Sequence, residues 1–420
     1  MSNPISQVTL KNGMKVMLKE IHTAPIISSW IWYRVGSRDE PTGKTGISHW
    51  TEHMMFKGTK KFPANILDKA ISREGGHWNA STSHDSTRYY ETMPAGKIDL
   101  ALRLEADRMK NSIFTEKEVA SERTVIISER EGHENEPMFR LSEAIQNHAF
   151  RVHPYHHEII GDMADLLAIT RDDLYAHYRT YYVPNNAVLS VAGDFETRPL
   201  LKRIRQLFER IPKGPNPPRL ARPEPQQKGE IRFSIEGPGE TTFIQLAYHF
   251  PSATDPDYFP LQVLDSLLNG ASGLSYKTSR LYRALVDKGH AVDVSGWSQA
   301  SIDPHLYRIT ITGHPKRKPE DALAVLDKEI NTLQDELVSS AEIRRAVKQA
   351  RAVFAYGSEN VTHQAFWMGY TAMFSTYDWF TTYLDKLGKV TPRDVQRVAR
   401  TYFQPANRVI GTYIPKGLEG

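Results

Sequence analysis

The sequence predicts an α+β protein built of two homologous α/β-sandwich domains that arose by internal duplication. Two observations predict this. Residues 169–186 match residues 390–407 without a gap over eighteen positions, from Thr170 and Thr391 through to Asn186 and Asn407. Chance would not hold that register, so the two halves are copies of one domain. In addition, each half contains short strand patterns and longer amphipathic helical patterns, so each copy mixes sheet and helix.

The length and a proline-rich stretch predict where the two domains meet. With 420 residues the chain is too long for one ordinary hydrophobic core. Six prolines fall between Pro212 and Pro225, which is typical of a semi-rigid, extended linker. We therefore expect a first domain over residues 1–212, a linker over residues 213–227 and a second domain over residues 228–420.

Composition excludes several classes of function. The net charge is only +4, from 53 basic and 49 acidic residues, and no Lys/Arg run favours nucleic acid or an anionic membrane as a partner. The chain has no cysteine, which excludes disulfides, thiolate zinc sites and a cysteine nucleophile. It also has no apolar N-terminal segment and no run of eighteen apolar residues. We expect a soluble protein of the cytoplasm or periplasm, without a membrane span.

The elements of the first half follow from turn residues, caps and apolar spacing. Asn12-Gly13 between alternating apolar residues predicts a hairpin, Pro63 opens a helix that Gly75-Gly76 ends, and Thr115 begins a capping box. The expected elements are a hairpin over Val8–Leu18, a strand over Ile26–Val35, a helix between Gly46 and Gly58, a helix over Pro63–Glu74, two strands within His77–Glu91, and helices over Lys97–Asn111 and from Thr115 to about Gly132.

The second half shows a similar mixture. The expected strands are Ile231–Ile235, Phe243–Phe250, one near Ala291–Trp297 and Leu306–Ile311, and the expected helices are Tyr258–Leu268, Glu320–Val338 and Ala341–Tyr356. The aromatic residues between Phe366 and Phe380 are expected to pack helices together rather than to form a ligand cage.

The five residues His49-Trp50-Thr51-Glu52-His53 carry the strongest chemical signal. Residues four apart share one helix face, so His49 and His53 can bind the same metal ion. Glu52 lies beside the metal without being forced to bind it, which is where a general base for a metal-bound water is needed. The pattern H-x-x-E-H also arises by chance in roughly a few of every hundred chains of this length, so its context must decide.

A catalytic zinc site needs a third protein ligand. The residues themselves leave five candidates for that ligand, namely Glu122, Glu129, His133, His77 and His84. Glu118, Glu122, Val125, Ile126 and Glu129 form one face of the helix that begins at Thr115, and a half-buried row of carboxylates needs basic partners or a metal.

Six further histidines could be taken for extra ligands, but they are expected to be surface or hydrogen-bonded side chains, because none shares a spacing with the motif. They are His77, His84, His133, His153, His156 and His157. His133 is the strongest rival to Glu129, but Gly132 is expected to end the helix before it. In the second copy of the repeat, Leu261, Leu264 and Asp265 stand opposite His49, Glu52 and His53, so only the first copy is expected to bind metal.

The sequence closely resembles the pitrilysin-type (M16) zinc peptidases, the inverzincin family that includes mitochondrial processing peptidase, insulin-degrading enzyme and the core proteins of respiratory complex III. The resemblance covers nearly the whole chain. The matching motifs are Gly46–Met54, Phe56–Thr59, Gly75-Gly76, Asn79-Ala80, Thr82-Ser83, Glu122, Glu129, Tyr182–Asn186 and Gly193-Asp194. It implies the metallohydrolase fold of mitochondrial processing peptidase and the half-size subfamily whose subunits pair.

The resemblance also implies roles for individual residues. It implies one Zn²⁺ per chain, held by His49, His53 and Glu129, with Glu52 as the base. Glu122 resembles the acid that orients a ligand histidine in the family. Asn79 and Ala80 resemble the edge strand that takes the substrate peptide as an added β-strand.

One departure from the family pattern concerns the substrate carbonyl. Active members supply an arginine and a tyrosine after a string that is present here as Ser279–Tyr282, but this chain has Val286 and Val292 at those positions. Arg283 or Tyr276 are the nearest substitutes, and neither matches the pattern.

We therefore expect a zinc endopeptidase subunit of a clam-shell dimer that hydrolyses peptides or small unfolded proteins. A paralogous M16 subunit would supply the arginine and tyrosine, with a homodimer as the other arrangement. The alternatives are a non-catalytic core or scaffold subunit and a module that clamps peptides without cleaving them.

Overall fold

The computed structural model describes residues 5–270 and 277–417, which pack into two units. The first unit comprises Met1–Glu131, His157–Arg222 and Ser358–Phe380, and the second comprises Gly132–His156, Pro223–Gly357 and Thr381–Gly420. No helix among the described residues is both long enough and apolar enough to cross a membrane.

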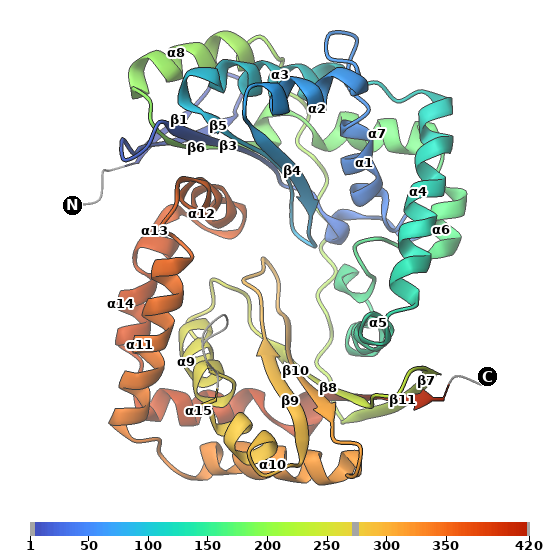
Figure 1. The fold of residues 1–420 in the computed structure, drawn as a ribbon, viewed down its shortest axis with the longest axis vertical. Coiled ribbons are helices and arrows are strands. Elements are labelled where there is room, and N and C mark those ends of the chain that lie inside the picture. The colour runs from blue at the N-terminus through green and yellow to red at the C-terminus, as the bar shows by residue number, and fades with distance from the viewer. Residues whose placement is uncertain (1–4, 271–276, 418–420) are drawn as a thin grey trace. The chain divides into compact units, whose positions relative to one another are not determined.

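A six-stranded sheet forms the centre of the first unit (Figure 1). Its strand order is β1-β2-β6-β3-β5-β4, which leaves β4 at one edge. The strands are β1 (Ser6–Thr9), β2 (Lys15–Glu20), β3 (Ile26–Tyr33), β4 (His77–Thr82), β5 (Thr87–Pro94) and β6 (Ala187–Gly193). The expected hairpin is confirmed, with Val8 opposite Val16 across β1 and β2.

Helices cover both faces of this sheet, which explains why every residue of β6 and nearly every residue of β3 is buried. The helices of the unit are α1 (Ile47–Met55), α2 (Ala64–Arg73), α3 (Ile98–Asn111), α4 (Glu116–Glu134, whose last three residues belong to the second unit), α6 (Met163–Ala168), α7 (Arg171–Tyr181), α8 (Thr197–Phe208), α12 (Val361–Phe374) and most of α13 (Tyr377–Thr381).

Helix α12 packs against β3 and β6 although it comes from the C-terminal half of the chain. Its Phe366 ring lies 5.3 Å from that of Trp30 and 5.4 Å from that of Trp32. Gly369 permits this approach, since a Cβ there would lie 1.9 Å from the Trp32 indole nitrogen. The expectation that these aromatic residues pack a helix is confirmed.

The second unit is built on a five-stranded sheet of order β7-β11-β8-β10-β9. Its strands are β7 (Ile231–Pro238), β8 (Phe243–Phe250), β9 (Ala291–Trp297), β10 (His305–Gly313) and β11 (Arg408–Lys416). Its helices are α5 (Pro137–Ala149), α9 (Tyr258–Leu268), α10 (Pro319–Asp335), α11 (Ser340–Tyr356), α14 (Tyr383–Gly388) and α15 (Pro392–Tyr402).

Helix α5 packs against the second sheet in the same way that α12 packs against the first, as a helix from the other half of the chain. It comes from the N-terminal half of the chain and packs on β7, β8 and β11, where Ile145 and Ala149 join Ala247 and Val409 in one hydrophobic cluster. The expected domains, residues 1–212 and 228–420, are continuous in sequence, whereas each packed unit takes a segment from the other half, Ser358–Phe380 in the first unit and Gly132–His156 in the second.

The internal duplication is visible in matching local structure. Helices α7 and α15 both begin with a capping box, in which the Thr170 and Thr391 side chains accept from the backbone three residues later. After each helix an asparagine side chain bonds back to the helix end, Asn186 to the Tyr181 carbonyl at 2.9 Å and Asn407 to the Tyr402 carbonyl at 2.7 Å.

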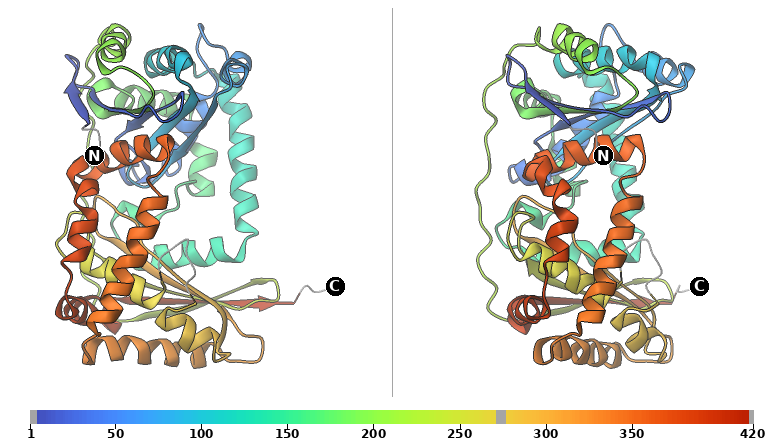
Figure 2. Two further views of the ribbon diagram at one scale, coloured as in Figure 1. Left: turned by 60° about the vertical axis from the view of Figure 1, so that its left-hand side comes forward. Right: turned by 90° about the vertical axis from the view of Figure 1, so that its left-hand side faces the viewer.

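The proline-rich stretch has the extended conformation that its composition predicts. Residues 209–230 contain no helix or strand, and they run as a long open segment (Figure 2).

Candidate metal centre

Helix α1 carries the H-x-x-E-H motif, and a buried carboxylate fixes its first turn. Gly46 caps the helix with φ of +84°, and a Cβ there would lie 2.3 Å from the Ile160 carbonyl oxygen. The backbone N–H groups of Gly46 and Ser48 both donate to the Glu40 carboxylate at 2.8 Å. Burial raises the pKa of Glu40 to about 8. This side chain satisfies two donors that the start of a helix otherwise leaves free.

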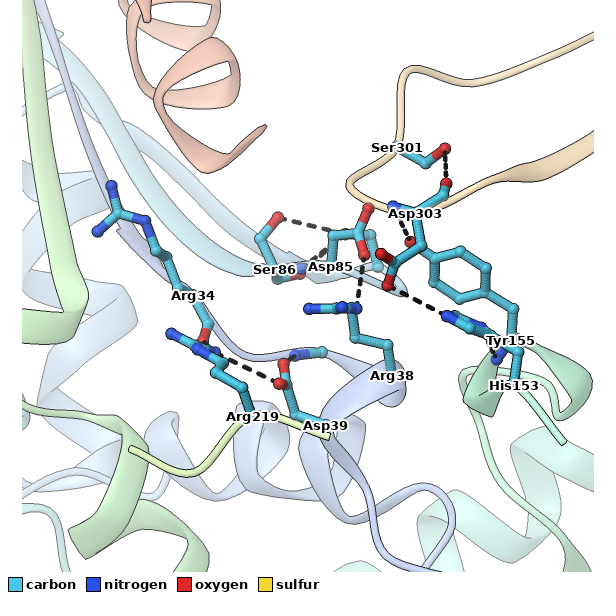
Figure 3. Close-up of polar contacts among 12 residues, drawn as sticks. Arg34, Arg38, Asp39, Asp85, Ser86, His153, Tyr155, Arg219, Ser301 and Asp303 are labelled. Carbon is cyan, nitrogen blue, oxygen red and sulfur yellow. Dashed lines mark hydrogen bonds and ion pairs between the residues drawn. The ribbon is translucent and has the colours of Figure 1, made fainter. Parts of the chain in front are cut away.

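The turn before α1 is held by an arginine of the proline-rich stretch (Figure 3). The Arg219 guanidinium donates to the Arg34 carbonyl at 2.5 Å, to Asn186 at 2.6 Å and to Asp39 at 3.3 Å. Burial raises the pKa of Asp39 to about 6. Arg219 thereby fixes the segment from which Glu40 reaches the helix.

The buried face of α1 packs on α7. Trp50, Met54 and Met55 are fully buried, and the Ser48 hydroxyl lies 3.4 Å from His177 Nε2. Burial lowers the pKa of His177 to about 3, so this imidazole is neutral at physiological pH. The opposite face is left to His49 and His53.

The structure brings His49, His53 and Glu129 together. One possible ligand atom from each lies within 4.8 Å of the others, and no second group of this kind occurs in the part of the chain that the structure describes. Nε2 of His49 is 3.9 Å from one Glu129 carboxylate oxygen, and Nε2 of His53 is 3.7 Å from the other. The two imidazole rings meet edge to face, with centroids 4.6 Å apart.

Glu122 supports His53 from the other side of its ring. His53 Nδ1 lies 2.9 Å from a Glu122 oxygen, and Lys57 Nζ contacts the second oxygen. Burial would raise the pKa of Glu122, but its bonds to His53 and Lys57 hold it below its usual range. Because an ionised carboxylate only accepts, Nδ1 of His53 carries a hydrogen, and in the neutral imidazole this leaves the lone pair on Nε2, the nitrogen that faces Glu129.

Glu52 is buried and makes one short hydrogen bond. The Thr82 hydroxyl, at the end of β4, donates to its carboxylate at 2.5 Å. Burial raises the pKa of Glu52, and the Thr82 bond opposes that shift. A carboxylate with a raised pKa accepts a proton more readily than one in open water.

Helix α4 is aligned with α1 by Arg123, the residue after Glu122. Its guanidinium lies 5.3 Å over the ring of Trp50 in α1 and donates to the Leu167 and Ile169 carbonyls at 3.1 and 2.6 Å. These contacts set the face of α4 that presents Glu122 and Glu129 to the motif.

One sequence expectation near the site is wrong. Helix α4 does not end at Gly132 but continues to Glu134, so His133 is helical. Glycine costs a helix only about 1 kcal/mol, and flanking helix-forming residues outweigh that. His133 is nevertheless not part of the ligand group, and its ring lies 5.1 Å from that of Phe139 within the second unit.

Three of the other histidines considered from the sequence lie within hydrogen-bonding distance of a polar partner. His77 lies 3.2 Å from the Tyr90 hydroxyl, His153 lies 3.1 Å from Asp303 (Figure 3), and His157 lies 3.1 Å from the Glu158 carbonyl. His84 is buried, and His156 is part of a short 3₁₀ turn. None of them joins the group of three described above.

Asn79 and Ala80 lie on β4, the edge strand of the first sheet. The Asn79 side chain is exposed and its oxygen accepts from the Ala80 N–H at 2.8 Å. In the second unit, the valines noted above lie on the π-helical turn Tyr282–Val286 and on β9, where Val292 is exposed. Arg283 belongs to the same turn, and Tyr276 lies outside the described residues.

The described residues of the second copy of the repeat contain no comparable site. In α9 the residues opposite the motif are Leu261, Leu264 and Asp265, and both leucines are fully buried. The Asp265 carboxylate accepts from the Tyr307 hydroxyl at 2.7 Å and from Asn269 at 2.9 Å. It is a hydrogen-bonded core acid and offers nothing to a metal.

The first-unit residues fit a zinc ion. Two imidazole nitrogens and a carboxylate oxygen are donors that zinc prefers, and bonds of 2.0–2.1 Å at tetrahedral angles put ligand atoms roughly 3.4 Å apart. The 3.7 and 3.9 Å separations are close to that spacing. Burial would lower the pKa of His53, but Glu122 and the nearby carboxylates raise it. A bound cation would oppose that rise, because a ligand imidazole must be neutral.

Comparison with known proteins places the chain in a family. It is 31% identical to the zinc protease PqqE of Helicobacter pylori, over 94% of this chain and 90% of that protein. The family model described as Insulinase (Peptidase family M16) matches residues 15–163, and that described as Peptidase M16 inactive domain matches residues 168–350. The chain belongs to the M16 peptidase family.

Other M16 relatives agree along the whole chain. The mitochondrial-processing peptidase subunit beta of Lentinula edodes is 27% identical, over 95% of this chain and 88% of that protein. The crystal structure of a protease from Helicobacter pylori superposes with a TM-score of 0.94 at 28% identity, covering 99% of this chain and all of that one. The fold expected from the sequence, two M16-type domains of mixed α/β structure, is thereby confirmed.

Two neighbours of the site were not assigned a role from the sequence. Thr82 bonds to Glu52, and Lys57 contacts Glu122. Both depend on distances between elements, the first between β4 and α1 and the second between the end of α1 and α4. No spacing in the sequence signals either contact.

Proposed function

We propose that this M16 chain is the metal-bearing subunit of a zinc-dependent endopeptidase. The observation that carries the proposal is the convergence of His49, His53 and Glu129 beside the buried carboxylate of Glu52. His49, His53 and Glu129 would hold one zinc ion, and Glu122 would orient His53 through its Nδ1 hydrogen.

Glu52 is the general base in this proposal. A zinc ion bound here would polarise the scissile carbonyl and make a neighbouring water more acidic. Glu52 takes the proton from the attacking water and can pass it to the leaving amine. Thr82 fixes the orientation of the Glu52 carboxylate, because its hydroxyl donates a hydrogen bond to one of the two carboxylate oxygens and leaves the other available.

The substrate is an extended peptide. Strand β4 is at the edge of its sheet, so a peptide can add to it as a further strand, bonded through the backbone near Asn79 and Ala80. The Ala80 N–H is held by the Asn79 side chain, a bond that an incoming backbone carbonyl can replace. Backbone recognition of this kind suits peptides or small unfolded proteins.

Full activity is proposed to need a second M16 subunit. Stabilising the developing oxyanion needs donors, and losing one costs roughly 10²–10³ in rate. The positions where the family resemblance expects an arginine and a tyrosine hold Val286 and Val292. The Lentinula edodes relative is by name a subunit. We infer a clam-shell dimer in which a paralogous subunit supplies the missing donors.

The same valines favour one alternative, a subunit that clamps peptides without cleaving them. A quenched-peptide assay separates the two. Zinc-loaded chain should cleave peptides of roughly ten to thirty residues, a length that spans an added strand, and chelator treatment should abolish the cleavage. Binding of the same peptides without zinc-dependent cleavage, both alone and with a paralogous subunit, would favour the clamp.

A further inference from the structure

Arg88 is a partly buried cation beside the proposed peptide-binding edge. It lies on β5, where it pairs with Ser81 of β4 on one side and with Trp32 of β3 on the other. Its guanidinium is 5.4 Å from the centre of the Trp32 ring and 5.5 Å from that of Phe366 in α12. These two aromatic contacts hold the side chain in one orientation.

Among the described residues no carboxylate lies within ion-pair distance of Arg88, although its charge interacts with that of Glu52 at longer range. Its one side-chain hydrogen bond runs from Nη2 to the Ser81 hydroxyl at 3.3 Å. Burial lowers the pKa of Arg88, although arginine remains protonated in proteins. By contrast, the buried Arg108 is paired with Glu105 and Glu91, and Arg408 with Glu230 and Asp327.

An unpaired, partly buried guanidinium is costly, and a bound anion would relieve that cost. Its remaining N–H groups are donors that suit the two oxygens of a carboxylate. The cost is therefore an indication of a binding role. The buried Arg108 and Arg408 contact carboxylates directly, and Arg123 donates to two backbone carbonyls, whereas Arg88 has a single hydrogen bond, to a hydroxyl.

The direction of the Arg88 side chain, towards the edge strand β4, indicates that the anion would belong to a peptide added to that strand. Neighbouring strands lie about 4.8 Å apart, so a guanidinium that reaches Ser81 has crossed from β5 to the edge strand. His77, Asn79 and Ser81 alternate on one face of β4, the face that Arg88 shares. In a peptide added to β4, the residue opposite Ser81 would project its side chain from that same face, next to the guanidinium.

We propose that Arg88 and Ser81 form a subsite that binds a carboxylate of the peptide substrate. This rests on the proposed function, because it takes β4 as the strand to which the peptide adds. The carboxylate can come from an aspartate or glutamate side chain or from the C-terminus of a short peptide. The subsite makes the chain prefer peptides that place one acidic group at a fixed distance from the cleaved bond.

The test moves a single glutamate through each position of an otherwise neutral quenched peptide, with glutamine at the same position as the reference. At one position kcat/KM should rise roughly ten- to a hundredfold over glutamine, the usual worth of a hydrogen-bonded charge pair. A parallel series with free and amidated C-termini distinguishes the two sources. If kcat/KM rises for a glutamate at an internal position, the bound carboxylate is the side chain. If the rise disappears when the C-terminus is amidated, the bound carboxylate is that of the C-terminus.

Arg88→Met should reduce the preference to within about twofold, since it keeps the apolar stem and removes the charge. Arg88→Lys should retain part of it. Arg103→Met, which removes a partly exposed arginine paired with Asp99 at 3.0 Å, is the matched control and should leave the preference unchanged. A glutamate preference that is absent, or that survives in Arg88→Met with unaltered zinc content and Tm, overturns the subsite.

Peptide binding to Glu52→Gln gives a readout that does not need hydrolysis. The Kd for the preferred glutamate peptide should be lower than for its glutamine counterpart, and Arg88→Met in the Glu52→Gln background should equalise the two. If peptides bind with this Arg88-dependent preference but the wild-type chain never cleaves them, the subsite holds and the endopeptidase proposal fails. Equal binding of both peptides in the presence of Arg88 overturns the subsite alone.

Discussion

Two residues of the candidate site, Glu52 and His53, are each oriented by one neighbouring side chain. Thr82 donates to Glu52, and Glu122 accepts from His53 while it contacts Lys57. At this scale the proposal makes two predictions, one for each supporting residue.

Thr82→Val should lower kcat roughly tenfold, because the valine keeps the shape but loses the hydrogen bond that orients the base. KM and zinc content should stay unchanged, and Thr82→Ser should restore most of the rate. Steady-state kinetics with metal analysis checks this. A fall in zinc content, or a valine variant as fast as the serine variant, would remove Thr82 from the positioning of Glu52.

Glu122→Gln should weaken zinc affinity and activity by roughly ten- to a hundredfold, because an amide holds the His53 ring less firmly. Glu129→Gln should lose the metal altogether. Competition of both variants with a chromogenic chelator measures the affinities. Full zinc in Glu129→Gln would move the third ligand elsewhere, with His133, still helical, the next residue to test.

The sequence could predict these residues only in part. His49, Glu52 and His53 follow from helix periodicity, because a spacing of four puts both histidines on one face. Choosing Glu129 over its rivals needed the family resemblance, since helix spacing cannot place α4 relative to α1. Arg88 was missed for a similar reason. That no acid lies within ion-pair distance of Arg88 becomes visible only when the carboxylates around it are located in space.

At the scale of elements, the motif helix depends on a glycine start and on a buried neutral histidine behind it. Gly46 must keep its positive φ beneath the Ile160 carbonyl, and His177 packs behind Ser48. Each feature predicts a measurable effect on stability.

Gly46→Ala should destabilise the protein by more than the roughly 1 kcal/mol that a left-handed alanine costs, because its Cβ also meets the Ile160 carbonyl. Gly43→Ala is the matched control. Gly43 has φ of +87° but nothing within 4 Å of an added Cβ, so only the backbone cost applies. Equal losses of Tm in the two variants would show that the close approach does not matter.

His177 should make folding sensitive to acid. Its pKa is about 3 in the folded chain and 6.5 in its ordinary state, so between these values the unfolded chain binds more protons. Its contribution to stability is complete above pH 6.5 and is lost as pH falls towards 3, by up to about 1.4 kcal/mol per pH unit. Denaturant unfolding at pH 7 and pH 5 should show a smaller loss in His177→Phe than in wild type. Equal losses would contradict this role.

Most helices and strands could be predicted from local signals, and several strands and helices of the second half match their expected bounds within a few residues. The pairing of helices with sheets could not. Nothing in the sequence of α12 indicates that Phe366 packs on Trp30 of β3 rather than on its sequence neighbours. An apolar helix face shows that the helix is buried on one side, but not which apolar surface it packs against.

At the scale of the whole molecule, the chain contains one unit with a candidate metal centre and a homologous unit whose described residues include no such group. Duplication explains the shared capping boxes, and the loss of the motif in α9 explains why Leu261 and Leu264 are simply core residues. Activity is therefore expected to depend on a partner as well as on the metal.

Isolated chain should cleave peptides weakly, and a paralogous M16 subunit that carries the arginine and tyrosine should raise the rate by roughly 10²-fold or more. Titrating that subunit into a fixed amount of this chain, with size-exclusion chromatography alongside, checks the gain and its stoichiometry. As a control, the same partner with its arginine and tyrosine changed to valine should bind without activating. Full activity as a homodimer would contradict the partner proposal and would indicate that Arg283 or another residue of this chain stabilises the oxyanion.

The most direct test of the central claim combines zinc content with peptide turnover in Glu52→Gln. The amide cannot accept a proton but fills the same space, so the variant should bind one zinc ion per chain, as the wild type should, and lose at least about 10² in turnover. Both quantities should be measured on the same preparations, alone and with the partner subunit. Near-wild-type turnover in Glu52→Gln, or wild-type protein that cleaves peptides equally well without zinc, would contradict the proposed function.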